Sequence, residues 1–176
     1  MAGIDESLSF VPVRIAVLVV SDTRTLETDT SGALLAERLQ AVGHELADRK
    51  IVKDDPALIR ETVQAWIDEP SVDVVISSGG TGLTGRDVTP EAVSPLFEKT
   101  IDGFSVIFHQ VSYQSVGLST LQSRAIAGLA KGTFIFCLPG SYAAVKDVWD
   151  KVISYHLDSR HKPCNLVELM PRLMET

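Results

Sequence analysis

SSGGTGLTGRDVTPEA, residues 77–92, joins an apolar run at residues 72–76 to a helix start at Thr89-Pro90-Glu91. The apolar run is typical of a buried strand. Thr89 suits the N-cap, with Pro90 at the first helical position and Glu91 in the first turn. A glycine-rich loop in this position lets backbone N–H groups approach an anion, and the helix dipole favours negative charge. The stretch predicts an α/β unit with a site for a phosphate-bearing ligand.

Two familiar phosphate-binding motifs do not fit this loop. Gly80, Gly82 and Gly85 match G-x-G-x-x-G, but in a dinucleotide-binding fold that motif opens the helix directly after the first strand. Here the helix starts later, at Thr89, after about the third predicted strand. The spacing of Gly80 and Gly85 also fits a P-loop, yet Arg86-Asp87 stands where Lys-Ser/Thr is required. The loop therefore predicts anion binding by some other arrangement.

Composition indicates one acidic globular domain. The chain has 176 residues, 45% of them hydrophobic, and a formal net charge of -7, which argues against nucleic acid or an anionic membrane as a partner. Four cationic side chains are available to line a local anion site: Arg24, Arg86, Arg124 and Lys146.

The N-terminus, the longest apolar run and the two cysteines bear on where the protein is found. The N-terminal residues are polar and acidic, unlike a signal peptide, and the longest apolar run, residues 15–20, is too short to span a bilayer. Cys137 and Cys164 form no C-x-x-C pair or metal-ligand spacing. We expect a cytoplasmic protein with reduced thiols.

Predicted strands and helices alternate along the chain. We expect a flexible arm at residues 1–11, a single domain at residues 12–160 and an irregular tail at residues 161–176. Apolar runs predict strands at residues 14–20, 72–77 and 133–138, and residues 45–52 are a weaker strand candidate. Helical periodicity predicts helices at residues 31–42, 54–69, 89–97, 103–116, 119–129 and 142–157. This order favours an α/β fold with a mostly parallel sheet and helices on both faces.

Ligands of such sheets bind beyond the carboxyl ends of the strands. Three polar loops follow predicted strands and should share that edge: residues 21–24, the glycine-rich loop, and Pro139-Gly140-Ser141. The last begins a long helix, with Ser141 as N-cap, and offers a second anion or ribose site. In the helix at 103–116, a stripe of apolar residues suits the core better than an oligomer interface: Phe104, Ile107, Phe108 and Val111.

Carboxylates accompany the predicted anion site. Asp87 beside a phosphate would repel it unless a cation such as Mg²⁺ lies between them. Of Asp54 and Asp55, one can cap the following helix while the other faces the site, and we assign Asp54 to the site. We expect the four histidines to be surface or packing residues, and no serine or cysteine has a nucleophile context. The pattern favours phosphoryl or nucleotidyl transfer without a covalent intermediate.

GGTG and RDVTPEA, with LPGS, AVK, DTSG, STLQSRAIAG and RHKPCNL elsewhere, closely resemble the MoaB/MogA family of molybdenum cofactor biosynthesis. The resemblance covers nearly the whole chain. It implies a three-layer α/β/α fold with a mostly parallel sheet and binding of molybdopterin, a pterin with a dithiolene and a phosphate. It also implies a homotrimer or homohexamer, and other enzymes of the pathway as further partners.

The resemblance implies an adenylyltransferase that uses Mg²⁺ and ATP to convert molybdopterin to adenylyl-molybdopterin and pyrophosphate. Asp54 and Asp87 carry over as catalytic, Mg²⁺-binding residues, although the first assignment can slip to Asp55. Carried over as substrate-binding are Ser21, Asp22, Gly79, Gly80, Thr81, Gly82, Arg86, Thr89, Pro139, Gly140 and Ser141.

Some relatives have lost the aspartate of RDVTP, whereas this chain keeps it. A non-catalytic binding or carrier protein and an oligomeric scaffold are the alternatives. The motifs leave open molybdenum or tungsten, and which loop holds the nucleotide.

Overall fold

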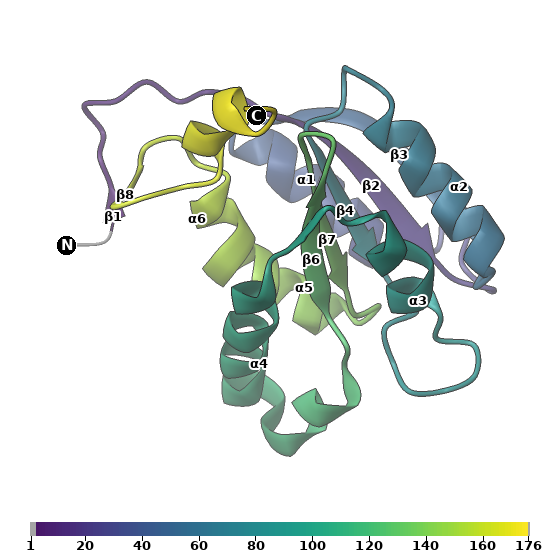
Figure 1. Cartoon of the computed structure of the whole chain (residues 1–176). Helices are drawn as coiled ribbons and strands as arrows, with labels where there is room; N and C mark the ends of the chain where they lie inside the picture. The colour runs from purple at the N-terminus through teal and green to yellow at the C-terminus, as the bar shows by residue number, and fades with distance from the viewer. Residues whose placement is uncertain (1–2, 176) are drawn as a thin grey trace.

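The computed structural model describes residues 3–175; residues 1, 2 and 176, which belong to the expected arm and tail, lie outside it. Its centre is a six-stranded sheet of order β3-β2-β4-β7-β6-β5 with helices on both faces (Figure 1). The strands are β2 Arg14–Val20, β3 Glu45–Val52, β4 Val74–Ser78, β5 Lys99–Thr100, β6 Ile126–Ala130 and β7 Thr133–Leu138. The main helices are α1 Ser31–Ala41, α2 Pro56–Ile67, α3 Thr89–Val93, α4 Asp102–Val116 and α5 Tyr142–Val148. The predicted three-layer α/β/α fold is confirmed.

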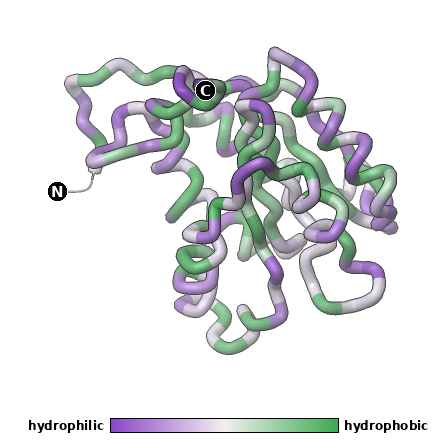
Figure 2. The backbone as a smooth tube through the Cα atoms, viewed as in Figure 1, coloured by the Kyte–Doolittle hydropathy of each residue, from purple (hydrophilic) through white to green (hydrophobic). Residues whose placement is uncertain are grey.

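Strand β2 shows why the sheet is covered on both sides. Its side chains alternate between two hydrophobic cores, with Ile15 and Val17 in one and Ala16 and Leu18 in the other. The first core contains residues of α1, α4 and α5, and the second contains residues of α2 and α3. A strand buried on both faces is hydrophobic along most of its length, and hydrophobic residues predominate in the central strands (Figure 2).

The strand order creates a crevice at the centre of the sheet. Strands β3, β2, β4 and β7 are mutually parallel. After β2 the chain adds β3 on one side and then crosses back to add β4 on the other, so β2 and β4 flank the topological switch point. Loops that leave neighbouring parallel strands in opposite directions open a crevice between them.

The predicted helix at residues 119–129 is wrong. A 3-10 segment, Gly117–Gln122, is followed by strand β6, which pairs antiparallel with β7. Lys131 and Gly132, both with positive φ, form the two-residue turn between them. On β6, the ring of Phe97 fills the space where a Cβ of Gly128 would lie. Tertiary packing has overridden the helical preference of an Ala- and Leu-rich segment.

The other predicted elements need smaller corrections. The helix expected at 89–97 is α3 followed by a 3-10 turn, Ser94–Leu96, because Pro95 lies inside it. The helix expected at 142–157 consists of α5, a π-helical turn at Trp149–Ile153, and α6 Ser154–His156. The apolar stripe on α4 is divided: Phe104 and Phe108 are buried, whereas Ile107 is 43% exposed.

The arm and tail meet at the end of the molecule opposite the glycine-rich loop (Figure 1). Strand β1, Gly3–Ile4, pairs antiparallel with β8, His161–Lys162. The tail continues into a 3-10 segment, Val167–Arg172. Phe10 of the arm packs on His44 and beneath the guanidinium of Arg160. Among residues 3–175, no helix has the length and apolar content needed to cross a membrane.

Candidate functional site

The loops that follow β2, β4 and β7 meet around one cavity, as the parallel order predicts. The cavity has a volume of about 360 Å³. Nine of the predicted site residues line it: Ser21, Asp54, Gly79, Gly80, Thr81, Gly82, Asp87, Pro139 and Gly140. Val20, Gln122 and Ser123 complete the lining. It lies beyond the carboxyl ends of the strands that flank the switch point.

Two glycines fix the floor of this cavity. Gly79 and Gly80 have φ values of +108° and +67°, which other residues rarely adopt. A Cβ on Gly79 would lie 2.2 Å from the carbonyl oxygen of Val20, and one on Gly80 would lie 2.3 Å from Thr89 Oγ1. In the described part of the chain, the N–H groups of Gly80 and Thr81 donate to no protein acceptor. The loop therefore offers backbone donors without covering them with side chains.

Thr89 supports the loop from below and does not line the cavity. It is fully buried and is the first residue of α3, with Val88 at the N-cap, so its predicted role as N-cap is wrong. The Thr89 hydroxyl donates to the carbonyl of Gly79 at 2.9 Å, and its N–H donates to the carbonyl of Gly80. Those two bonds bind the glycine-rich loop to α3.

Arg124 supports the other end of the loop. Its guanidinium donates to the carbonyl oxygens of Gly82 and Asp87, each at 2.8 Å, and pairs with Glu91. The N–H of Arg124 donates to the carbonyl of Thr81. Arg124 is one of the four cations that the sequence makes available to an anion, but in the structure it holds the loop in shape.

The environments of the two predicted catalytic carboxylates differ. The Thr84 hydroxyl and N–H donate to Asp87 Oδ2, and these hydrogen bonds hold the pKa of Asp87 below its ordinary value. Burial raises the pKa of Asp54, the charge of Asp22 raises it further, and Arg86 opposes both effects. Asp87 is thus fixed in its ionised form, whereas Asp54 carries a negative charge that its surroundings leave poorly compensated.

Asp55 has the other role that the sequence offers to this pair. Its carboxylate accepts hydrogen bonds from the N–H groups of Ala57 and Leu58 and caps α2. Pro56, in the first turn, completes the start of that helix. Asp54, one residue earlier, lines the cavity.

Asp22 and Arg86 lie at the mouth of the site and do not line the cavity. Arg86 donates through Nε and Nη2 to the Asp22 carboxylate at 2.8–3.0 Å. Asp22 Oδ1 also accepts the N–H of Asp54 at 3.3 Å. The hydrogen bond from Arg86 holds the pKa of Asp22 below its ordinary value. This ion pair joins the loop after β2 to the loop after β4.

Ser141 begins α5 as predicted, accepting the N–H of Ala144. It lines a neighbouring cavity of about 340 Å³, which shares Gln122, Ser123 and Pro139 with the first. Hydroxyl groups dominate its polar lining: Ser112, Ser115, Ser119, Thr120, Ser123 and Ser141. Gln122 and Ser123 are absent from the predicted site because they fall in the segment expected to be a helix. The signal that could have found them is the STLQSR motif, which contributes to the family resemblance without an assigned role.

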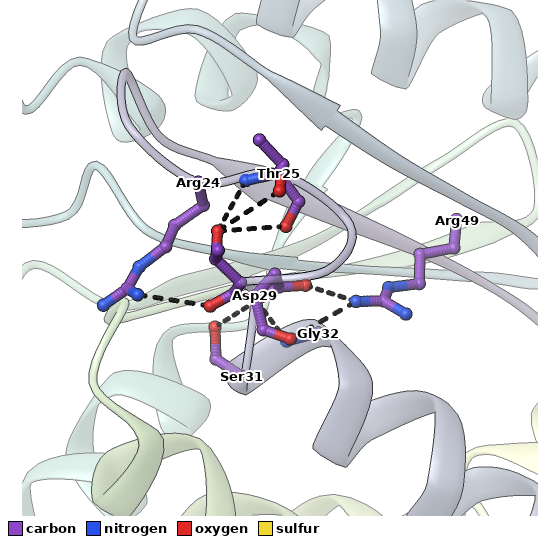
Figure 3. A network of polar contacts seen from close by, with 7 residues as sticks. Arg24, Thr25, Asp29, Ser31, Gly32 and Arg49 are labelled. Carbon is purple, nitrogen blue, oxygen red and sulfur yellow. Dashed lines mark hydrogen bonds and ion pairs between the residues drawn. The ribbon is translucent and has the colours of Figure 1, made fainter.

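A buried ion pair supports the loop after β2 (Figure 3). Asp29, 4% exposed, accepts hydrogen bonds from the N–H of Gly32 and the hydroxyl of Ser31. Its second oxygen pairs with Arg49 of β3 at 2.7 Å. This network fixes the start of α1 against the edge strand, and Arg24 closes the loop by donating to the carbonyl of Thr28.

Magnesium fits the carboxylates when it arrives with a phosphate. Within residues 3–175 there is no group of three His, Cys, Asp or Glu side chains able to hold a metal ion. Mg²⁺ commonly binds one or two carboxylates together with substrate phosphates. Asp54 and Asp87 supply such a pair, and their oxygens lie against Gly80 and Gly82, where a Cβ would fill the space.

Comparison with known proteins identifies relatives of this chain. Residues 16–159 match the model of a family described as a probable molybdopterin binding domain. Molybdenum cofactor biosynthesis protein B of Escherichia coli K12 is 47% identical over 159 residues, covering 90% of this chain and 94% of that protein.

Solved structures match equally well. A crystal structure of Molybdenum cofactor biosynthesis protein B has a TM-score of 0.80 and 45% identity, covering 83% of this chain and 91% of that one. The tungsten cofactor synthesizing protein MoaB from Pyrococcus furiosus has a TM-score of 0.72 and 36% identity, covering 81% and 91%. The family model and these relatives show that the chain belongs to the MoaB/MogA family of molybdenum cofactor biosynthesis.

Proposed function

We propose that this protein is a molybdopterin adenylyltransferase. The observation that carries the proposal is the pairing of a backbone anion cradle, residues 79–82, with the two carboxylates Asp54 and Asp87 around one cavity. An anion-binding protein that performs no chemistry gains nothing from two aspartates at its binding site, because both repel the ligand. A nucleotidyl transfer needs them to hold the metal ion that neutralises the phosphates.

In the proposed reaction, a phosphate oxygen of molybdopterin attacks the α-phosphorus of ATP. The bond from that phosphorus to the bridging oxygen breaks, and pyrophosphate leaves. The N–H groups of Gly80 and Thr81 bind phosphate oxygens, and Asp87, held ionised by Thr84, keeps a fixed position for the metal. Mg²⁺, held by Asp54 and Asp87, supplies charge neutralisation for the transferring group when bound. The protein contributes mainly positioning and electrostatics.

The second cavity suits the heterocycle of the substrate. A pterin ring carries several hydrogen-bond donors and acceptors, and the hydroxyl-rich lining beyond Gln122 and Ser123 offers partners for them. We therefore assign the nucleotide phosphates to the glycine-rich loop and the pterin to the cavity beside Ser141. This assignment of the two cavities is the same whether the finished cofactor carries molybdenum or tungsten.

The test is release of pyrophosphate by the purified protein with ATP, Mg²⁺ and molybdopterin. We expect release that depends on molybdopterin and disappears when magnesium is chelated. Asp87→Asn should lower turnover by about 100-fold while molybdopterin still binds. Asp55→Asn is the matched control, because it alters the helix cap and not the cavity. Binding of molybdopterin without release of pyrophosphate would instead make the chain a carrier protein of the same pathway.

The assembly is part of the proposal. Apolar side chains are exposed on α4 and the following 3-10 segment, among them Val106, Tyr113, Leu118 and Leu121. Exposed apolar surface of this kind marks contacts between proteins. We propose a homotrimer or homohexamer in the cytoplasm, and sedimentation equilibrium distinguishes the two states.

A further inference from the structure

The ion pair between Asp22 and Arg86 is placed where a ligand would disturb it. Asp22 follows Ser21, and Arg86 precedes Asp87; both of these neighbours line the cavity. The Arg86 guanidinium therefore reaches across the mouth of the site, from the glycine-rich loop to the loop after β2. Its Nε donates to Asp22 Oδ2 and its Nη2 to Asp22 Oδ1, the forked arrangement that arginine also uses for phosphate.

Other cations near the site have different tasks. Arg124 holds the loop through Gly82 and Asp87, and Arg24 donates to a carbonyl in its own loop. Lys146 pairs with Asp150 on its own helix. Arg86 is distinguished from these three because its partner is a carboxylate at the mouth of the site.

The pair is weak enough to be exchanged. The side chains of Arg86 and Asp22 are 65% and 40% exposed, and exposed ion pairs contribute little to stability because water screens them. A phosphate group offers the same forked geometry with more negative charge than a carboxylate. A polyphosphate at the cradle should therefore attract Arg86 away from Asp22.

We propose that Arg86 exchanges partners on ligand binding, leaving the Asp22 carboxylate for a phosphate of the ligand. Asp22 is then a competitor that holds the arginine in the empty site, and it is not a ligand-binding residue. The proposal rests on the proposed function only in taking the ligand to carry phosphate. Removing the acidic residue of the pair should strengthen binding, whereas removing the basic one should weaken it.

Calorimetric titration with inorganic pyrophosphate tests this without pterin or turnover. Arg86→Gln should weaken binding about tenfold, the effect of one charge-assisted forked contact. Asp22→Asn should strengthen it by roughly two- to fivefold, the amount that an exposed pair resists exchange. Arg86→Lys should fall between the wild type and Arg86→Gln, because lysine keeps the charge but not the fork.

Matched controls separate exchange from a general change in charge. Lys53→Gln removes one positive charge beside Asp54, and Glu27→Gln removes one negative charge from the loop that contains Asp22. Both residues are exposed. Each control should shift pyrophosphate affinity by less than about twofold. In the double variant with both Asp22→Asn and Arg86→Gln, the gain from Asp22→Asn should disappear, because no arginine remains to be released.

If Asp22→Asn and Arg86→Gln both weaken binding, the pair is a structural tie between loops and the proposal is overturned. The proposal is also overturned if Asp22→Asn still strengthens pyrophosphate binding in the Arg86→Gln background. The gain in affinity would then come from removing the repulsion between the Asp22 carboxylate and pyrophosphate. Neither result depends on pyrophosphate release from ATP, so failure of the adenylylation proposal is recognised separately, in the turnover assay.

Discussion

At the site, the missing side chain of a glycine matters as much as the hydrogen bond of a neighbouring threonine. Gly80 leaves room for Thr89 Oγ1 and for the Asp54 carboxylate, whose Oδ1 lies 3.3 Å from the position of a Cβ. Gly80 is predictable as part of the anion cradle because so many glycines between a strand and a helix suit a loop that approaches an anion closely. Thr89 is wrongly predicted as the N-cap because a threonine before proline fits the N-cap pattern. Its buried hydroxyl is needed instead for the bond to Gly79.

Alanine at Gly80 should therefore impair both anion binding and folding. The new methyl group would meet Thr89 Oγ1 at 2.3 Å and would favour negative φ, so the loop must shift away from α3. We expect pyrophosphate affinity to fall at least about tenfold, with a loss of about 1–3 kcal/mol in the free energy of unfolding. Gly85→Ala is the matched control, since nothing lies within 4 Å of its Cβ position. Equal affinity in the two variants would show that the loop conformation does not matter for anions.

The helices and strands that the sequence predicts correctly are those whose apolar residues are the ones buried in the structure. For example, strand β2 is apolar from Ile15 to Val20, and helix α2 has Asp55 and Pro56 at its start. Strand β6 is missed because Ile126–Ala130 is short and its composition favours a helix, while its pairing with β7 is tertiary. Gln122 and Ser123 are missed with it, so an error about one element removes two residues from the predicted site.

Helix α1 depends on a charge pair that lies outside its own sequence. Asp29 fixes the first turn through Gly32, and Arg49 of β3 neutralises it in a position where only 1% of the Asp29 side chain is exposed. Arg49→Met would leave a buried carboxylate without its cation, and we expect a loss of about 3 kcal/mol in the free energy of unfolding. Urea denaturation measures this. Adding Asp29→Asn to Arg49→Met should recover part of the loss; no recovery would mean that Arg49 acts through packing alone.

At the scale of the whole molecule, the arm and tail form a cover over His44. The ring of His44 accepts the N–H of Val13 at 3.2 Å and lies between Phe10 and Trp149. Burial lowers the pKa of His44 to about 4 from 6.5, partly offset by the charge of Asp158. No local pattern in the chain connects residue 10 with residue 44 or residue 160. The pairing of strands β1 and β8 and the hydrogen bonds of Ser159 with Ser9 and Val11 bring the arm and the tail together.

This cover makes stability depend on pH. The unfolded chain binds a proton at His44 near pH 6.5, but the folded protein does so only near pH 4. The stability contributed by neutral His44 is therefore complete above pH 6.5 and is lost as the pH falls toward 4, by up to about 1.4 kcal/mol per pH unit. Phe10→Ala should expose the ring, raise its pKa and reduce this slope in urea denaturation between about pH 7 and 5. Phe97→Ala, at another half-buried ring, should lower stability and keep the slope; the same slope in both variants would contradict the role of the arm.

The close approach of Gly79 and Gly140 has a consequence for how such a protein changes over generations. A Cβ on Gly140 would lie 3.3 Å from the Cα of Gly79, so the two central loops touch through their main chains. Every amino acid has the same main-chain N–H, apart from proline, and a substitution cannot delete it. In the proposed function, the backbone of these loops determines the preference for an anion, and the side chains around Gln122 and Ser123 determine the choice of heterocycle. If the loop binds phosphate as proposed, descendants of this scaffold would acquire new ligands by altering those side chains and would still inherit the phosphate site.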